Sequence, residues 1–195
     1  MDKNIVIKEI MAISHYIYNK HLVPGKSGNI SAKFMENGIQ KVAITRSGVV
    51  KKNVAEEDIV IIDMDGNLLE GDKKPSSETF LHLGIYKNRD DIKGIVHGHP
   101  PYVTGFSMSD KSLKRLEGFG EIKNPIIPSV KYSRPGSKEL AKDTAEMMKN
   151  EDVVILKNHG LVAAGVNLDE AAALAEFVED VAKTQFVSYV LNLNK

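Results

Sequence analysis

Two segments with helical periodicity stand at the ends of this chain, and a series of short strand-like runs lies between them. Apolar residues recur every three or four positions in residues 1–21, and residues 167–192 form a second, longer helical pattern. Residues 29–34 and 41–48 have the pattern of short strands, and residues 58–71 predict a β-hairpin with its turn at Asp65–Gly66. Strands and helices alternate irregularly. The pattern therefore favours an α/β domain in which helices flank a mixed or mainly antiparallel sheet, and not a doubly wound parallel sheet.

The second half of the chain continues this mixture. Residues 74–89 and 136–150 predict helices, while residues 92–99, 124–130 and 152–160 predict extended segments. Ser76 or Ser77 is the expected N-cap of the helix at 74–89, which puts Glu78 in its first turn. A chain of 195 residues can bury a sizeable core, so a single domain spanning residues 1–195 is expected.

Composition removes several classes of function. The chain contains 26 basic and 26 acidic residues, so no overall positive field attracts nucleic acid or an anionic membrane. It has no cysteine, and any metal site must therefore use histidine, aspartate or glutamate. The first 21 residues lack the apolar core of a signal peptide, and no apolar run approaches the roughly 20 residues of a membrane helix. We therefore expect a cytoplasmic protein with neither nucleic acid nor membrane as a partner.

A pair of histidines stands at the end of one predicted strand. His97 and His99, in the run "IVHGH", are two residues apart, a spacing that points both side chains to the same face of a strand. His159 ends a second apolar run, "VVILKNHG", in a matching context. Three imidazoles at the ends of two apolar runs suit a Zn²⁺ ion, whose nitrogen ligands lie at about 2 Å. Polar residues are also common at strand ends for no chemical reason, and the residues alone leave both interpretations open.

Glu78 is the most suitable fourth ligand, since it lies where a helix dipole favours an anion. The sequence Ser-Ser-Glu is also ordinary chemistry for a helix start, so a purely local role stays open. His15, His21 and His82 lie in helical segments without a partner at ligand spacing, and we expect them to be structural.

Three short polar turns are candidates for binding phosphate. They are "KSGNIS" at residues 26–31, "TRSG" at 45–48 and "PSSE" at 75–78. Backbone N–H groups in such turns can hold a phosphate without a net positive charge. Turns use the same residue types for conformational reasons, so each signal is weak alone.

Together, "SGNIS", "TRSG", "PSSE", "HGH" and "NHG" occur in an order that resembles the class II aldolase/adducin superfamily, in particular its zinc-dependent L-fuculose-1-phosphate aldolases. The resemblance covers nearly the whole chain. It implies a three-layer α/β/α fold around a central, mainly antiparallel sheet. It also implies a homotetramer with active sites at the subunit interfaces.

The resemblance also assigns residues and chemistry. One Zn²⁺ per chain, or another divalent metal, would bind to Glu78, His97, His99 and His159. The substrate phosphate would bind to Gly28, Asn29, Ser47, Gly48, Ser76 and Ser77. The expected reaction is retro-aldol cleavage of a small phosphorylated ketose, through a zinc-stabilised enediolate, to dihydroxyacetone phosphate and an aldehyde. Glu78 would move the proton.

Sister activities remain as alternatives. Ribulose-5-phosphate 4-epimerases carry lysine where this chain has Thr45, which favours an aldolase. Methylthioribulose-1-phosphate dehydratases use a glutamate after the His-x-His segment, where this chain has Glu117 and Glu121; surface positions are expected for both. Adducin-like assembly domains lack the metal histidines, which this chain retains.

One departure from the aldolase pattern concerns the aldehyde. Fuculose-phosphate aldolases place a tyrosine after His-x-His, in a region where this chain has Phe119 and where Tyr102 and Tyr132 are the nearest tyrosines. The resemblance therefore leaves the aldehyde open, and a broader or different acceptor is compatible with the sequence.

Overall fold

One sheet of eight strands crosses the molecule in the order β4-β3-β2-β1-β5-β8-β7-β6. The computed structural model describes residues 2–118, 122 and 124–193. The strands are β1 (Asn29–Glu36), β2 (Ile39–Thr45), β3 (Ile59–Asp63), β4 (Leu68–Glu70), β5 (Gly94–Gly98), β6 (Ser129–Val130), β7 (Val153–Leu156) and β8 (Gly160–Gly165). Every neighbouring pair is antiparallel except β6 and β7, which are parallel. The predicted mixed, mainly antiparallel sheet is confirmed.

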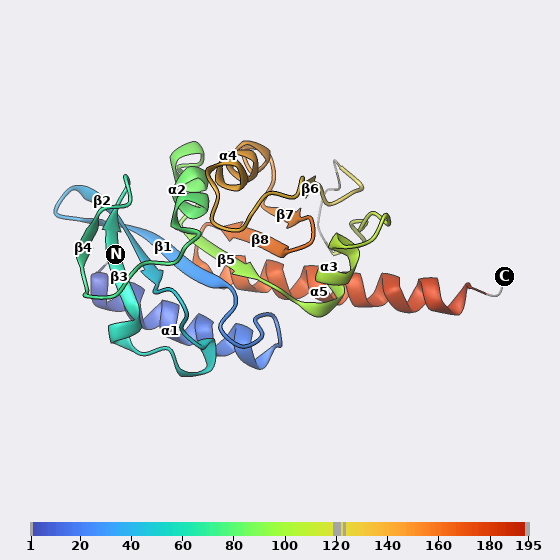
Figure 1. Cartoon of the computed structure of the whole chain (residues 1–195), viewed down its shortest axis with the longest axis horizontal. Coiled ribbons are helices and arrows are strands. Elements are labelled where there is room, and N and C mark those ends of the chain that lie inside the picture. The colour runs from blue at the N-terminus through green and yellow to red at the C-terminus, as the bar shows by residue number, and fades with distance from the viewer. Residues whose placement is uncertain (1, 119–121, 123, 194–195) are drawn as a thin grey trace.

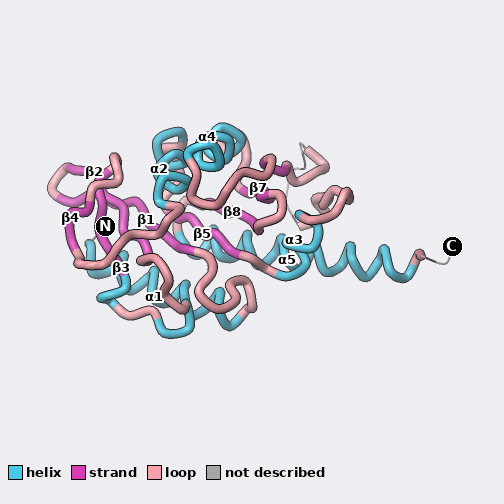
Figure 2. The backbone as a smooth tube through the Cα atoms, in the orientation of Figure 1, coloured by secondary structure: helices cyan, strands magenta, loops and turns pink. Residues whose placement is uncertain are grey.

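Helices cover both faces of this sheet, as Figures 1 and 2 show. The helices are α1 (Lys3–Asn19), α2 (Thr79–Asn88), α3 (Pro101–Ser107), α4 (Lys138–Met147) and α5 (Leu168–Leu191), with 3-10 turns η1 (Lys51–Asn53) and η2 (Glu56–Asp58). The apolar side chains of α1, α3 and α5 share one buried cluster with one face of the sheet, and those of α2 and α4 share another cluster with the opposite face. The three-layer α/β/α arrangement is therefore confirmed.

Strand β7 contributes apolar side chains to the helix layers on both faces of the sheet. Val153 and Ile155 belong to the cluster on the α5 side, while Val154 and Leu156 belong to the cluster on the α4 side. Successive side chains of a strand point to opposite faces, so a strand covered on both sides has to be apolar throughout.

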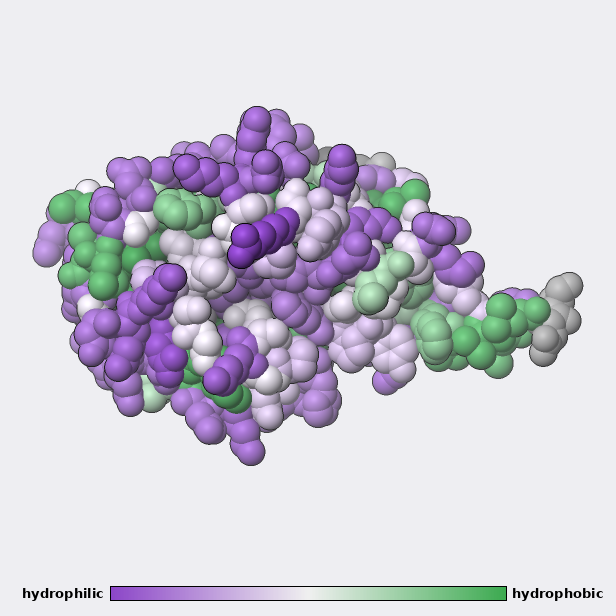
Figure 3. Space-filling model, viewed as in Figure 1, coloured by the Kyte–Doolittle hydropathy of each residue, from purple (hydrophilic) through white to green (hydrophobic). Residues whose placement is uncertain are grey.

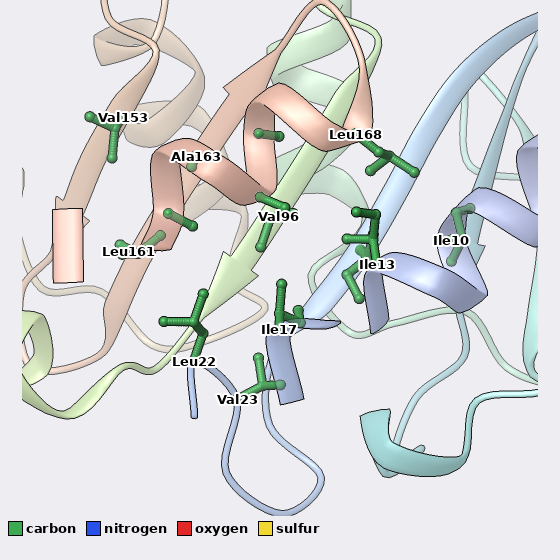
Figure 4. Packing of buried hydrophobic residues seen from close by; sticks show 14 of the residues in the cluster. Ile10, Ile13, Ile17, Leu22, Val23, Val96, Val153, Leu161, Ala163 and Leu168 are labelled. Atoms are coloured by element: carbon green, nitrogen blue, oxygen red, sulfur yellow. The ribbon is translucent and has the colours of Figure 1, made fainter. Parts of the chain in front are cut away.

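Helix α1 forms as its periodicity predicts. The Asp2 carboxylate caps it by accepting a hydrogen bond from the Asn4 N–H at 2.7 Å. Ile10, Ile13 and Ile17 lie on this helix in the same buried cluster as the sheet residue Val96 (Figure 4). Burial of each such side chain contributes about 1.5–3 kcal/mol to folding, and this packing fixes the helix against the strand that carries His97.

The end of α5 projects beyond the sheet (Figure 1), and its surface there is apolar (Figure 3). Phe186, Val187, Val190 and Leu191 are exposed on these last turns. No helix in the described part of the chain combines the length and the apolar character needed to cross a membrane.

Candidate active site

Three histidines converge at the C-terminal end of β5, beside the turn that joins β7 and β8. His97 lies on β5, His99 follows that strand, and His159 lies in the turn between β7 and β8. The Nε2 atoms of His97 and His99 are 3.0 Å apart, and each pair of the three rings has its centroids 4.8 Å apart. One nitrogen from each residue lies within 4.8 Å of the others. The expected convergence of these imidazoles is present in the structure.

Sheet pairing explains how residues so far apart in sequence meet. Strand β5 pairs with β8 at Gly98 and Leu161, which brings the β7–β8 turn beside His99. A Cβ atom at Gly160 would lie 2.2 Å from the Gly98 carbonyl oxygen, so only glycine allows this approach. His159 is therefore a turn residue just before β8, not the last residue of a strand as the sequence pattern suggested.

Glu78 completes the cluster from the other side. Its Oε2 lies 3.1 Å from His97 Nε2, and its Oε1 lies 3.6 Å from His159 Nε2. The Asn29 amide donates a hydrogen bond of 3.0 Å to the same Oε2. The side chain is buried, so its charge is compensated by these neighbours and not by bulk water.

The start of α2 differs from the prediction. Neither Ser76 nor Ser77 is the N-cap; that position belongs to Glu78, whose side chain makes no capping bond. Ser76 Oγ instead accepts a hydrogen bond from the Glu78 N–H at 3.2 Å. The expectation of a serine cap with Glu78 in the first helical turn was wrong, because the helix begins at Thr79 and Glu78 is the residue just before it.

The electrostatics of the cluster follow from burial and proximity. Burial opposes ionisation of Glu78, but contacts with His97 and His159 prevail and hold the pKa of Glu78 well below its usual value. Burial likewise disfavours a charged His97, yet the Glu78 carboxylate raises the pKa of His97 overall. Burial and then the His97 imidazole lower the pKa of His99 to about 3 and that of His159 to about 4. At neutral pH the site thus offers an ionised carboxylate and two neutral imidazoles, those of His99 and His159.

These residues fit a divalent metal ion. Glu78 Oε1 and His159 Nδ1 are buried side-chain atoms without a hydrogen-bond partner among the described residues. The His97 Nδ1–H donates to the Leu161 carbonyl at 2.8 Å, which leaves His97 Nε2 free to act as a ligand. Imidazole nitrogens with one carboxylate oxygen form a donor set that Zn²⁺ accepts.

The three polar turns lie around Glu78. An isolated bridge pairs Arg46 with Pro75, and the Ser47 N–H donates to the Lys74 carbonyl at 3.0 Å. The turns carrying Ser47–Gly48 and Ser76–Ser77 are therefore adjacent. Gly28–Asn29 approaches from β1, where Asn29 pairs with His97.

Gly28 and Asn29, which are predicted to bind phosphate, also have structural tasks. So does Ser76, through the hydrogen bond that its Oγ accepts from the Glu78 N–H. Gly28 has a φ of +69°, and a Cβ atom there would lie 2.6 Å from the His97 carbonyl oxygen. Asn29 uses its amide on Glu78 and on His82. By contrast, Ser47, Gly48 and Ser77 are exposed. Phosphate binding by all six residues stays a prediction.

The residues that bear on the sister activities and on the aldehyde differ in their surroundings. Thr45 is fully buried, and its Oγ1 accepts a hydrogen bond from the Ile30 N–H at 3.2 Å. Glu117 and Tyr132 are exposed, and Tyr102 packs its ring on Phe186. Glu121 and Phe119 lie outside the described residues.

The sequence interpretation missed one neighbour of the site. His82, expected to be only structural, contacts Asn29 through its Nε2 atom. No local spacing could reveal this contact, because the partner is 53 residues away on β1.

Comparisons with known proteins agree with this geometry. Residues 8–186 match the family model described as the class II aldolase and adducin N-terminal domain. The L-fuculose phosphate aldolase of Methanococcus maripaludis (strain C7) is 38% identical over 180 residues, which cover 92% of this chain and 94% of that protein. A solved structure of an L-fuculose 1-phosphate aldolase superposes with a TM-score of 0.89 at 32% identity, covering 98% of this chain and 90% of the other.

Two further relatives carry different names. The 5-deoxy-D-ribulose 1-phosphate aldolase of Bacillus thuringiensis serovar kurstaki is 35% identical, covering 92% of this chain and 83% of that protein. The 3-oxo-tetronate 4-phosphate decarboxylase of Haemophilus influenzae is 31% identical, covering 92% and 86% respectively. Fold and matches together define the chain as a lyase of the aldolase class. It belongs to the class II aldolase/adducin family.

Proposed function

We propose that this protein is a zinc-dependent aldolase that cleaves a small phosphorylated ketose to dihydroxyacetone phosphate and an aldehyde. The observation that carries the proposal is the meeting of three imidazoles and one buried carboxylate beside the turns of Ser47–Gly48 and Ser76–Ser77. The names of the relatives support a sugar-phosphate substrate of the L-fuculose-1-phosphate type, with a deoxypentulose phosphate as the second candidate.

The proposed cofactor is one Zn²⁺ per chain. His97, His99, His159 and Glu78 would hold it, and when bound it supplies a Lewis acid that polarises the carbonyl of the ketose. Elemental analysis of gently purified protein should therefore find close to one divalent metal per chain.

The phosphate turns orient the substrate. Backbone N–H groups and hydroxyls near Ser47 and Ser77 would bind the phosphate at C1 and so hold C3 and C4 near Glu78. Cleavage requires loss of the proton on the C4 hydroxyl to solvent, from which Glu78 takes up a proton, and rupture of the C3–C4 bond. The electron pair passes to C3, which is next to the carbonyl, and C3 then accepts a proton to give dihydroxyacetone phosphate.

Glu78 is the group proposed to move the proton at C3. Its low pKa arises from contacts with His97 and His159. A carboxylate that turns toward the substrate loses these contacts and becomes a stronger base. The same carboxyl can then remove a proton from C3 during synthesis and return it during cleavage.

The proposal extends to assembly and location. We include a single catalytic domain over residues 1–195 and a homotetramer with active sites at its interfaces, and the exposed apolar end of α5 offers a surface for self-association. A phosphorylated sugar substrate also supports a location in the cytoplasm.

A substrate panel tests the proposed reaction. Wild-type protein is incubated with L-fuculose-1-phosphate, 5-deoxyribulose-1-phosphate, ribulose-5-phosphate, methylthioribulose-1-phosphate and 3-oxo-tetronate 4-phosphate, and release of dihydroxyacetone phosphate is coupled to a dehydrogenase. We expect release from at least one of the two 1-phosphates that yield an aldehyde. Epimerised or dehydrated product without cleavage would contradict the proposal and assign the chain to a sister activity, and loss of CO₂ from a 3-oxo acid phosphate would assign it to the decarboxylases.

A further inference from the structure

A chain of buried polar side chains runs from Glu78 away from the histidines and into the interface between α2 and the sheet. Glu78 Oε2 accepts from Asn29 Nδ2 at 3.0 Å, and Asn29 Oδ1 lies 2.5 Å from His82 Nε2. His82 Nδ1 lies 2.7 Å from Ser31 Oγ, which is 2.8 Å from the hydroxyl of Tyr86. Ser31, His82 and Tyr86 are essentially inaccessible to solvent.

The chemistry of these groups fixes the direction of each hydrogen bond. The Glu78 carboxylate only accepts, so the Asn29 amide must present its NH₂ group to it and its carbonyl oxygen to His82. That oxygen also only accepts, so His82 must carry its proton on Nε2. In a neutral imidazole Nδ1 is then an acceptor, which the Ser31 hydroxyl satisfies as a donor.

The far end of the chain is anchored to the backbone. The Tyr86 hydroxyl donates to the Ser31 carbonyl oxygen at 2.9 Å. Between Glu78 and the Ser31 hydroxyl, every donor and acceptor is matched in one arrangement only. Burial keeps that arrangement, because an unpaired buried polar group costs about 1–3 kcal/mol. Burial, followed by the charge of His97, lowers the pKa of His82 to about 3, which is consistent with a neutral ring.

We propose that His82 is a positioning residue, whose Nε2–H fixes the Asn29 amide so that this amide holds the Glu78 carboxylate in place for metal binding and proton transfer. The role of Glu78 rests on the proposed function. Without the Nε2–H donor, the Asn29 side chain can rotate and turn its carbonyl oxygen toward Glu78, which repels the carboxylate. His82 itself touches neither substrate nor reacting atoms.

Two substitutions at position 82 separate positioning from packing. Glutamine places an N–H near the position of imidazole Nε2, whereas asparagine reaches only as far as Nδ1. We expect His82→Asn to weaken zinc affinity, measured by competition with a chromophoric chelator, by about 10- to 100-fold, the usual effect of losing an outer partner of a metal ligand. His82→Gln should stay within about threefold of wild type, and Tyr86→Phe, which leaves the Nε2–H in place, should do the same.

Kinetics add a second readout. His82→Asn should lower kcat by a similar factor while KM for the phosphorylated substrate changes little, and His82→Gln should restore kcat. Equal losses in His82→Asn and His82→Gln, in proteins whose metal-free unfolding midpoints match, would overturn the proposal in favour of simple packing. Unchanged zinc affinity in His82→Asn would overturn it as well.

A third test uses the wild-type protein and therefore does not depend on whether a variant folds. Long-range ¹H–¹⁵N correlation spectra of the metal-free protein report which nitrogen of a neutral imidazole carries the proton. We expect the Nε2–H form for His82, and a Nδ1–H form would overturn the proposal because Nε2 could not donate to Asn29. The tautomer and the zinc affinity do not depend on which sugar is cleaved, so a failure of the aldolase assay would leave these results readable.

Discussion

Replacing Glu78 with glutamine is expected to lower kcat for cleavage by at least about 10³-fold, the upper part of the range for loss of a general acid–base group. Glutamine keeps the size of the side chain and can still accept a hydrogen bond from Asn29. It cannot take a proton from C3 or return one, and it contacts His97 and His159 without a negative charge. Binding of a phosphorylated ligand should change much less, because the exposed turns at Ser47 and Ser77 remain. Steady-state kinetics and calorimetric titration with dihydroxyacetone phosphate measure the two effects.

Glu117 supplies the matched control for this experiment. It is exposed, and it occupies the region in which a dehydratase would carry its glutamate. Glu117→Gln should therefore retain wild-type kcat within about twofold, as surface substitutions usually do. If Glu78→Gln were fully active, Glu78 would have no part in the mechanism. If Glu117→Gln were inactive instead, the acid–base role would move to Glu117.

Replacing His159 with alanine should remove the metal. The imidazole lies in the β7–β8 turn, with its Nε2 3.6 Å from Glu78 Oε1. Loss of a direct ligand should exceed the effect of losing an outer partner, so we expect zinc affinity to fall by more than about 100-fold. Cleavage activity should fall with it and return in part at high zinc concentration. Elemental analysis and chelator competition give the affinity.

His21 provides the control for a lost imidazole. It is exposed, and its φ of +60° suits asparagine, so His21→Asn removes a histidine at low structural cost. That variant should keep one metal per chain. Retention of tightly bound metal by His159→Ala, with the fold intact, would remove His159 from the ligand set.

Much of this architecture could be predicted from local patterns. The isoleucines of α1 repeat at helical spacing, and the hairpin of β3 and β4 has its turn at Asp65–Gly66, as expected. Alternation along β5 also predicted that His97 and His99 share a face. These features depend on neighbours within a few residues, where periodicity is informative.

Other features depend on distant partners and were missed. Strand β8 is rich in glycine and alanine and has a single β-branched residue, Val162, so its local pattern is weak. Its pairing with β5 and β7 defines it. Helix α3 spans just seven residues and begins with Pro101. Proline is favourable in the first turn of a helix, but the local sequence of so short a segment is also typical of a loop. The N-cap of α2 shifted because Glu78 faces the histidines, and such tertiary contacts override local capping rules. His82 acquired its neighbours in the same way.

Proton exchange on dihydroxyacetone phosphate alone tests the central claim most directly, since it requires no knowledge of the aldehyde. In D₂O the zinc-loaded wild-type protein should replace one of the two protons on the hydroxymethyl carbon of dihydroxyacetone phosphate with deuterium. Proton NMR measures the rate of this exchange. Zinc-loaded Glu78→Gln should exchange at least about 100-fold more slowly. Exchange at equal rates in both proteins would contradict the assignment of Glu78, and no exchange in a wild-type protein that holds metal and binds the ligand would contradict the proposed aldolase chemistry.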